Sequence, residues 1–290
     1  MTLADLICQS IAQDKCGGSK WYALQRIARE QFAQKPAKKL KAADYISFAR
    51  KRHDGGAAPS TIMGDMVQIR QPLEMATVDL GMDDVSLIEF DRAMSRLEKL
   101  GLVATSRARR RRVSDDEIGQ ITEYFGSRKS DIPMPLIIEY QVASTRRIGE
   151  TTRVTVGGFD AAKHTILVPD VKHPTHKEGN HKRAFLPERA YEIHCQFKPR
   201  TSSPEERFFP YISKSITDKF SRAVDALKID DLHLHDLRGE GISRLLESGY
   251  SIEDVMMVSL HDSADTLRKH YAAPRPEILL NGPASMRARS

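Results

Sequence analysis

The C-terminal third of the chain contains residues that could bind and attack a phosphate. His235 and Arg238 are three residues apart, and residues at this spacing share one face of a helix. A second histidine, His261, and a tyrosine, Tyr271, follow along the chain. Imidazole and guanidinium groups can donate hydrogen bonds to phosphate oxygens, and a phenol can act as a nucleophile. These residue types predict a phosphate site.

The segment that connects these residues is predicted to form a helix, a tight turn and a second helix. Apolar residues recur at helical spacing from Ile242 to Leu246, and Gly249 is placed to end that helix through a left-handed cap. Ser251 then has the position of an N-cap, with Asp254 three residues later. This order would carry His261 back beside the first histidine and the arginine.

The same stretch resembles the C-terminal signature of the tyrosine recombinases, or phage integrases. That signature runs His-x-x-Arg, then a His or Trp, then a nucleophilic Tyr, and it matches His235, Arg238, His261 and Tyr271 in order. The segments HDLRGEGISRLLESG and LRKHYAAPRPE are similar to integrases of bacterial mobile elements. The resemblance implies a site-specific integrase of a mobile element.

Two further site residues are implied by the resemblance. The motif R-I-G-E is similar to the first arginine motif of the family, which makes Arg147 the catalytic arginine and Arg146 its neighbour. The family also places a lysine on a β-hairpin, and Lys177 fits that place best. Lys172 and Lys182 are alternatives, because hairpin registers slip easily.

In the family, the tyrosine attacks a DNA phosphodiester and forms a 3′-phosphotyrosine, which keeps the bond energy for rejoining. Arg147 and Arg238 would hold the non-bridging oxygens, and His261 would donate a further hydrogen bond. Lys177 would protonate the departing 5′ oxygen, and His235 would assist proton transfer at the nucleophile. The resemblance implies no metal and no ATP.

Some positions depart from the family pattern. Tyr271 lies one residue further from His261 than is usual, so His270 occupies the usual tyrosine register. Leu260 stands where a glycine commonly precedes the second histidine. Two alternative hypotheses therefore stay open: a type IB topoisomerase-like enzyme that relaxes DNA, and a DNA-binding protein with impaired catalysis.

The length, charge and composition of the chain limit the classes of protein to which it can belong. The 290 residues are enough for two domains, and the net charge of +6 favours an acidic partner such as DNA. Neither a long apolar run nor a signal peptide is present, so we expect a cytoplasmic, nucleoid-associated protein that does not bind a membrane. The cysteines, Cys8, Cys16 and Cys195, have no metal-ligand spacing and are odd in number, which argues against a disulfide framework.

Residues 1–105 are predicted to form a helical bundle, which the resemblance identifies as the core-binding domain. Four segments have helical apolar spacing: WYALQRIAREQF, AADYISFARKRH, the stretch that Pro59 opens, and VSLIEFDRAMSRLEKLG, which Gly101 ends. Basic residues in two adjacent stretches are candidates for contact with the DNA backbone: Lys38, Lys39, Lys41, Arg50, Lys51 and Arg52. An exposed, solvated face is the alternative for such runs.

Residues 106–113 are predicted to form a basic interdomain linker. Its arginines are candidates for phosphate contacts: Arg107, Arg109, Arg110, Arg111 and Arg112. Ser114 and Glu117 then have the S-x-x-E spacing of a capping box, which begins the next helix. The catalytic domain is predicted to span 114–290.

The catalytic domain is predicted to be mixed, so the fold class is α+β and mostly helical, with a small antiparallel sheet. A strand is expected in AAKHTILVP, and a hairpin around residues 178–180. Two helices are expected between residues 191 and 228, and their apolar stripe is predicted to be core: Phe208, Phe209, Ile212, Ile216, Phe220, Val224 and Leu227. The spacing of His173, His176 and His181 fits no standard zinc site.

The resemblance also implies an assembly. The two domains would form a C-shaped clamp around double-stranded DNA, and four copies would act together on paired recombination sites. Accessory proteins that bend DNA or control direction are possible partners. Residues 278–280 form the one apolar patch of the tail and are a candidate for docking on a neighbouring subunit.

Overall fold

The computed structural model describes residues 1–13, 18–83, 85, 87–106, 109, 111–171, 179–197 and 199–270, without the side chain of His270. The chain divides into two compact units, Met1–Arg107 and Ala108–Ser290. Each unit has its own buried apolar cluster. Of the described residues of the predicted linker, Ser106 belongs to the first unit, and Arg109 and 111–113 belong to the second.

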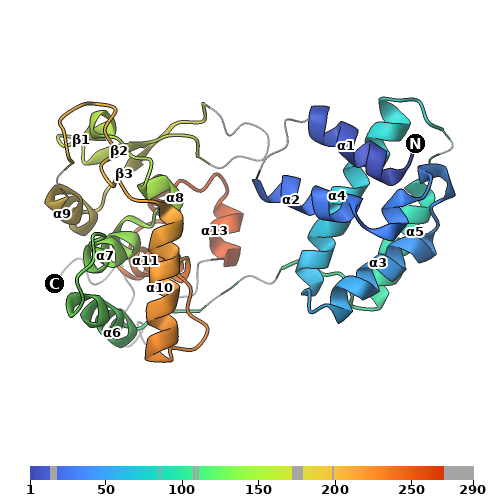
Figure 1. Ribbon diagram of the computed structural model, residues 1–290. Helices are drawn as coiled ribbons and strands as arrows, with labels where there is room; N and C mark the ends of the chain where they lie inside the picture. Colours follow the sequence, from blue (N-terminus) through green and yellow to red (C-terminus); the bar gives the residue numbers. More distant parts are fainter. Residues whose placement is uncertain are drawn as a thin grey trace. The chain divides into compact units, whose positions relative to one another are not determined.

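The first unit is helical throughout its described elements (Figure 1). These are α1 (Leu3–Gln13), α2 (Gly18–Ala28), the short 3₁₀ turns η1 (Gln31–Gln34) and η2 (Ala37–Lys39), α3 (Ala42–Asp54), α4 (Pro59–Val78) and α5 (Leu87–Lys99). The last four α-helices match the predicted segments, and α1 is one helix more than the apolar spacing predicts. The side chains of Leu3, Leu6 and Ile7 are buried on the inner face of α1.

The stripe that defines α4 shows why this bundle forms. Pro59 occupies the first turn, where its missing N–H has no cost. The apolar residues at helical spacing along α4 are all 0% exposed: Ile62, Met66, Ile69, Leu73 and Ala76. Gly101, with φ +68°, follows the end of α5 in the left-handed conformation that glycine adopts freely.

The second unit combines helices with one three-stranded antiparallel sheet of order β1-β2-β3 (Figure 1). Its elements are α6 (Asp115–Gly126), α7 (Met134–Ser144), α8 (Ile148–Thr151), η3 (Val156–Gly158), β1 (Phe159–Asp160), β2 (Thr165–Val168), β3 (Lys182–Phe185), α9 (Glu188–Gln196), α10 (Ser213–Leu227), α11 (Asp236–Glu247), α12 (Ile252–Ser259) and α13 (Ala264–His270). The predicted fold class, mostly helical with a small antiparallel sheet, is confirmed.

Local signals in the sequence set the ends of several of these helices. Ser114 and Ser251 each cap a helix in a capping box, with Glu117 and Asp254 as the partners three residues later. Gly249 has φ +94° directly after the end of α11. The predicted helix, turn and helix are therefore confirmed.

One glycine holds α11 close to α7. A Cβ added to Gly241 would lie 2.0 Å from the carbonyl oxygen of Val142, so no other residue fits at this crossing without moving the backbone. This close packing places the start of α11 against the end of α7, where the R-I-G-E motif begins.

The predicted apolar stripe before α11 is core with one exception. Phe209, Ile216 and Phe220 are fully buried, but Ile212 is 70% exposed. The prediction for Ile212 is wrong because α10 begins only at Ser213, so Ile212 is its N-cap and does not share the buried face of the helix.

β2 and β3 form an antiparallel hairpin, but residues 179 and 180 lie on its returning side and not at its predicted centre, because Val168 pairs with Lys182. Val171 donates its backbone N–H to Asn180, and Gly179 has φ +76°. Residues 172–178 and the tail, 271–290, lie outside the described residues. Within the described part of the chain, no helix is long and apolar enough to cross a membrane.

Candidate active site

Arg238 and His261 meet at the centre of the second unit. Arg238 lies on the first turns of α11 and His261 follows the end of α12, and Nη2 of the guanidinium lies 3.1 Å from Nε2 of the imidazole. Arg238 also donates to the carbonyl oxygens of Thr145 at 2.5 Å and Ser259 at 2.9 Å. The predicted return of His261 to Arg238 is confirmed.

His261 lies between Arg238 and a buried hydroxyl. Nη2 of Arg238 lies 3.1 Å from Nε2 and 3.4 Å from Nδ1 of the ring, so this contact does not select a tautomer. The hydroxyl oxygen of Ser259 lies 2.7 Å from Nδ1 and can donate to that nitrogen or accept from it. Burial first, and the charge of Arg238 second, lowers the pKa of His261 to about 3, so the ring is neutral at pH 7.

Glu150 lies beneath this pair with two further arginines. Its carboxylate is 2.6 Å from Arg147, 3.6 Å from Arg146 and 3.9 Å from Arg238. The side chains of Glu150 and Arg238 are 2% and 1% exposed. Burial would raise the pKa of Glu150, but the three arginines together hold it below its usual value. We name these four residues the Glu150 cluster.

The two neighbouring arginines of the R-I-G-E motif have different surroundings. The side chain of Arg146 is 0% exposed, whereas that of Arg147 is 31% exposed. Arg146 donates to the carbonyl oxygen of Val258, near the end of α12, and at 3.3 Å to that of Ser144. Arg147 is the one of the two that solvent, and so a substrate, can reach.

Left-handed residues precede both parts of this site. Thr145, with φ +56°, ends α7 before the two arginines, and Leu260, with φ +55°, ends α12 before His261. This conformation is costly for a β-branched or bulky side chain, and such strain is concentrated at functional sites. Leu260 therefore has the backbone geometry that the expected glycine would adopt.

His235 is the N-cap of α11 and is exposed, whereas Arg238 is buried. The two residues therefore differ in exposure, although both line one cavity. Removal of part of the His235 ring from water, followed by the charge of Arg238, lowers its pKa. A cavity of about 180 Å³ next to these residues is lined by Gln141, Arg146, Ile148, Thr217, Ser221, His233, Leu234, His235 and Arg238.

The remaining predicted catalytic residues, Tyr271 and Lys177, lie outside the described residues, as does the alternative Lys172. The other alternative, Lys182, lies on β3 and forms an ion pair with Asp262, the residue that follows His261. The base of the hairpin is therefore held beside the site.

The described linker arginines bind carboxylates of the second unit. Arg109 pairs with Asp231 and Asp236, Arg111 with Glu117, and Arg112 with Glu240 and Glu247. Arg107 and Arg110 lie outside the described residues. The sequence shows the arginine run but not these partners, which lie more than a hundred residues away for Arg109 and Arg112.

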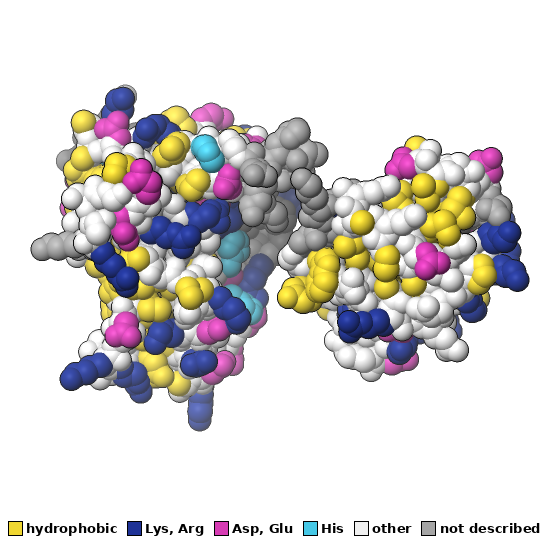
Figure 2. Space-filling view, turned by 45° about the horizontal axis from the view of Figure 1, so that its top comes forward, with side chains coloured by type: hydrophobic (Ala, Val, Ile, Leu, Met, Phe, Trp, Pro, Cys, Tyr) yellow, Lys and Arg dark blue, Asp and Glu magenta, His cyan; other side chains and the backbone are white. Residues whose placement is uncertain are grey.

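The basic residues predicted to bind DNA in the first unit lie on its surface. Lys38, Lys39, Lys41, Arg50 and Lys51 are exposed, and Arg52 is half-buried. Lys51 forms an ion pair with Glu30, and Arg52 lies 2.9 Å from the buried carboxylate of Asp65. Figure 2 shows Lys and Arg side chains on both units, with histidines close to some of them on the second unit.

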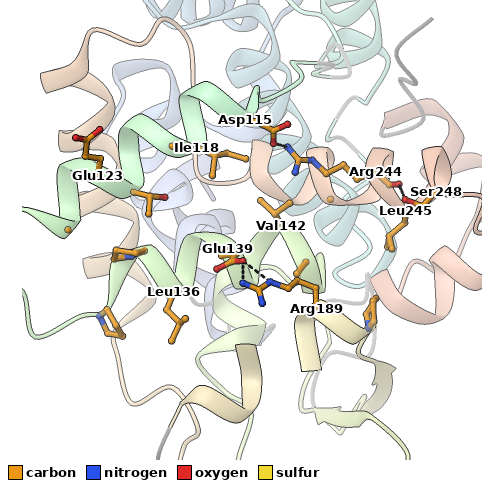
Figure 3. Close-up of a pocket in the computed structure, with 18 residues that line it drawn as sticks. Asp115, Ile118, Glu123, Leu136, Glu139, Val142, Arg189, Arg244, Leu245 and Ser248 are labelled. Carbon is orange, nitrogen blue, oxygen red and sulfur yellow. Dashed lines mark hydrogen bonds and ion pairs between the residues drawn. The ribbon is translucent and has the colours of Figure 1, made fainter. Parts of the chain in front are cut away.

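A wide hollow lies elsewhere on the second unit. It has a volume of about 1010 Å³, and its walls come mainly from α6, α7 and α11, including Ile118, Leu136 and Leu245 (Figure 3). None of the predicted catalytic residues lines it. Among the described residues, no group of three or more His, Cys, Asp or Glu side chains could hold a metal ion.

Sequence reasoning missed three residues of this site. Glu150 was visible only as the acid of the R-I-G-E motif, and Arg146 only as a neighbour. Ser259 had no signal, because its role depends on how α12 ends against α11.

Comparison with known proteins shows the family and the fold of this chain. The shufflon-specific DNA recombinase of Escherichia coli is 26% identical over 166 residues, which cover 57% of this chain and 41% of that protein. The solved structure of the Tn1549 transposon integrase in complex with a circular intermediate DNA matches with a TM-score of 0.74 at 14% identity, over 100% of both chains.

A lambda integrase dimer bound to a COC′ core site matches with a TM-score of 0.70 at 15% identity, over 95% of this chain and 78% of that one. These structural likenesses show the fold. The model of the phage integrase family matches residues 111–277, which include the whole described site. The chain belongs to the phage integrase family.

Proposed function

We propose that this protein is a site-specific DNA recombinase that cuts and rejoins DNA strands through a 3′-phosphotyrosine. The observation that supports it best is the Glu150 cluster, in which three arginines surround one carboxylate beside two histidines of lowered pKa. The positive charge there exceeds the negative charge, and a phosphodiester would supply the missing anion.

The proposed cleavage step follows from these groups. The phenol oxygen of Tyr271 attacks the phosphorus, its proton passes towards His235, and the bond to the 5′ oxygen breaks. Lys177, with Lys172 and Lys182 as alternatives, protonates that departing oxygen. Rejoining reverses the step, with the 5′ hydroxyl as the attacking group.

Two arginines would hold the phosphate. Arg147 is accessible, whereas Arg238 must be uncovered, which requires an exchange of its hydrogen bonds to carbonyl oxygens for bonds to the phosphate. His261 would then use the tautomer in which Ser259 donates to Nδ1 and Nε2–H donates to the phosphate. Ser259 suits either tautomer because a hydroxyl both donates and accepts.

This mechanism requires neither a metal nor ATP, because guanidinium groups neutralise the phosphate and the phosphotyrosine conserves the bond energy. We expect cleavage to proceed unchanged in excess EDTA and without nucleotide. A loss of activity that only a divalent metal restores would contradict this part of the proposal.

The partners follow from the same proposal. Both units would bind the same DNA duplex, the first through its exposed basic residues, and four protomers would act on two paired sites. A lambda integrase tetramer bound to a Holliday junction has a TM-score of 0.68 to this chain at 15% identity, which supports a tetramer as the working assembly. The protein would act at the nucleoid, with accessory proteins that set direction.

A nicked suicide substrate tests the proposal. The recombination site is first located from the DNA that flanks the gene, and the substrate is nicked near the cut so that the released fragment diffuses away. We expect the wild type to form a denaturant-resistant protein-DNA adduct and Tyr271→Phe to form none. His270→Ala is the matched control, and it should still form the adduct.

Other outcomes would favour other hypotheses. An adduct that survives Tyr271→Phe but not His270→Ala would move the nucleophile to His270. Relaxation of supercoiled DNA that lacks a paired site would favour the topoisomerase-like alternative. Tight, specific binding with no adduct would favour a DNA-binding protein with impaired catalysis.

A further inference from the structure

Arg109 holds the segment that leads into α11. Its Nε and Nη2 donate to the carboxylate of Asp236 at 2.7 and 2.9 Å, and its Nη1 donates to both carboxylate oxygens of Asp231 at 2.8 and 2.9 Å. Nη2 also donates to the backbone carbonyl of Asp231. Every nitrogen of this guanidinium is therefore engaged by the second unit.

Asp236 connects this contact to His235. It is the first residue of α11, directly after His235, and its side chain is 5% exposed. Its carboxylate also accepts a hydrogen bond of 2.8 Å from the backbone N–H of His233. Asp236 thus closes the turn on which His235 lies, and Arg109 fixes the carboxylate that closes it.

A second linker arginine holds α11 one turn further along. Arg112 donates to the fully buried carboxylate of Glu240 at 2.7 and 3.1 Å, and the backbone N–H of Val113 donates to the same group at 3.0 Å. Asp236 and Glu240 lie before and after Arg238 on the helix. The linker arginines therefore bind α11 at two positions, one before and one after Arg238.

A phosphate contact for Arg109 would break this arrangement. It would leave the buried carboxylate of Asp236 without its cation, and an uncompensated buried charge is strongly unfavourable. The contacts thus favour a role inside the protein.

We propose that Arg109 is a positioning residue: through Asp236 it fixes His235 and the start of α11, and it promotes strand cleavage without binding DNA. This inference rests on the proposed recombinase function. It replaces the expectation from the sequence that Arg109 neutralises a phosphate.

The test separates binding from cleavage. DNA affinity is measured over a range of salt concentrations, and the rate of adduct formation is measured in single turnovers at saturating suicide substrate, for the full chain. The variants are Arg109→Ala, Arg109→Lys, Asp236→Asn and the double variant Arg109→Lys/Asp236→Asn. Arg109→Lys keeps the positive charge but loses the two-pronged contact.

We expect the Arg109→Lys and Asp236→Asn proteins to bind DNA within about 2-fold of the wild type, with the same salt dependence, and to form the adduct about 10-fold to 100-fold more slowly. The double variant should be no slower than the slower single variant, because both changes remove one contact. Arg189→Ala is the matched control, since Arg189 also bridges two carboxylates, Glu139 and Glu192, but on the exposed surface. It should change neither quantity.

A phosphate ligand would give the opposite pattern. Arg109→Ala would then weaken binding and lower the salt slope by about 0.9, the value for one phosphate contact, while the rate at saturating DNA stayed that of the wild type. The inference would also be overturned if the rate reductions caused by Arg109→Lys and Asp236→Asn multiplied in the double variant, because the two residues would then act independently. If Arg109→Ala does not fold, as thermal unfolding would show, the other three variants decide.

The two failures are distinguishable. No adduct from the wild type on its located site would refute the recombinase function and this inference with it. If the wild type forms the adduct and the Arg109→Lys and Asp236→Asn variants form it at the same rate, only the inference about Arg109 is refuted.

Discussion

Each unit of this protein has a buried carboxylate that binds more than one arginine, but the two sites differ in balance. In the first unit, Asp65 binds Arg26 and Arg52 at 2.6 and 2.9 Å, and both arginines reach solvent. We name these three residues the Asp65 cluster. Its charges are close together, and water can screen what the carboxylate does not neutralise.

The Glu150 cluster of the second unit has a larger excess of positive charge, and more of that charge is buried. One carboxylate faces three arginines, and two of these arginines lie 3.6 and 3.9 Å away and are almost fully buried. They donate to backbone carbonyl oxygens instead. Burial of a charged side chain without a matching counter-charge is unfavourable for folding. Charged residues that are buried in this way are candidates for a functional role. The difference supports the proposal that the Glu150 cluster binds an anion, whereas the contacts of the Asp65 cluster join the helices of the bundle.

The largest expected effect comes from removing the one carboxylate of the Glu150 cluster. Glu150→Gln should lower the free energy of unfolding by about 3–5 kcal/mol, because the arginines lose their counter-charge in a buried site. Urea unfolding followed by circular dichroism measures it. Glu139→Gln, at an exposed ion pair with Arg189, is the control and should cost less than about 1 kcal/mol. If Glu150→Gln and Glu139→Gln lowered the free energy of unfolding equally, the buried cluster would not differ from an exposed ion pair.

The next effect concerns catalysis. Arg238→Lys should slow adduct formation at saturating DNA by about 10²–10³-fold, because a lysine cannot supply the two-pronged donor that the transition state requires. DNA affinity should change little, since one buried residue contributes little to a long backbone interface. Single-turnover cleavage and a binding assay measure the two. A variant that cleaves like the wild type would show that Arg238 is structural.

A third buried carboxylate, that of Glu240, allows the comparison to be tested through the pH dependence of stability. Burial would raise the pKa of Glu240, but Arg112 and Arg244 lower it to about 2, below its usual 4.5. Because the folded pKa is the lower one, its contribution is present above about pH 4.5 and is lost as the pH falls towards 2. On the order of 3 kcal/mol is at stake, from about 1.4 kcal/mol per pKa unit.

Thermal unfolding between pH 5 and 2 measures that contribution. The wild type should lose stability over this range, and Glu240→Gln should be less stable at pH 5 but show a flatter dependence. Parallel curves for the two proteins would indicate that other carboxylates dominate acid unfolding.

The smallest effect is expected in the Asp65 cluster. Arg26→Met should cost about 1 kcal/mol, because Asp65 keeps Arg52 and the removed charge was partly exposed. Cleavage at saturating DNA should not change. A loss above about 3 kcal/mol would show that the first unit also depends on a poorly compensated buried charge.

Local signals explain how much of the fold was predictable. Capping boxes at Ser114 and Ser251, Pro59 at a helix start and Gly249 at a helix end act over a few residues, so they are visible in the chain itself. The pairing of Arg238 with His261 was also predictable, because the turn between the two helices is short. Ile212 was misplaced because its burial depends on where α10 begins against the rest of the core.

From the sequence alone, the helices α2 to α5, the small sheet and the order of the family signature were predictable, but α1 was not. The sequence could not decide which of Arg146 and Arg147 is buried, which partner each linker arginine binds, or that Ser259 holds His261. Those facts depend on pairs of residues far apart in the chain, such as Arg109 with Asp236 and Arg112 with Glu240. The tertiary structure decides them, because burial and Coulomb energy depend on distance in space and not on spacing along the chain.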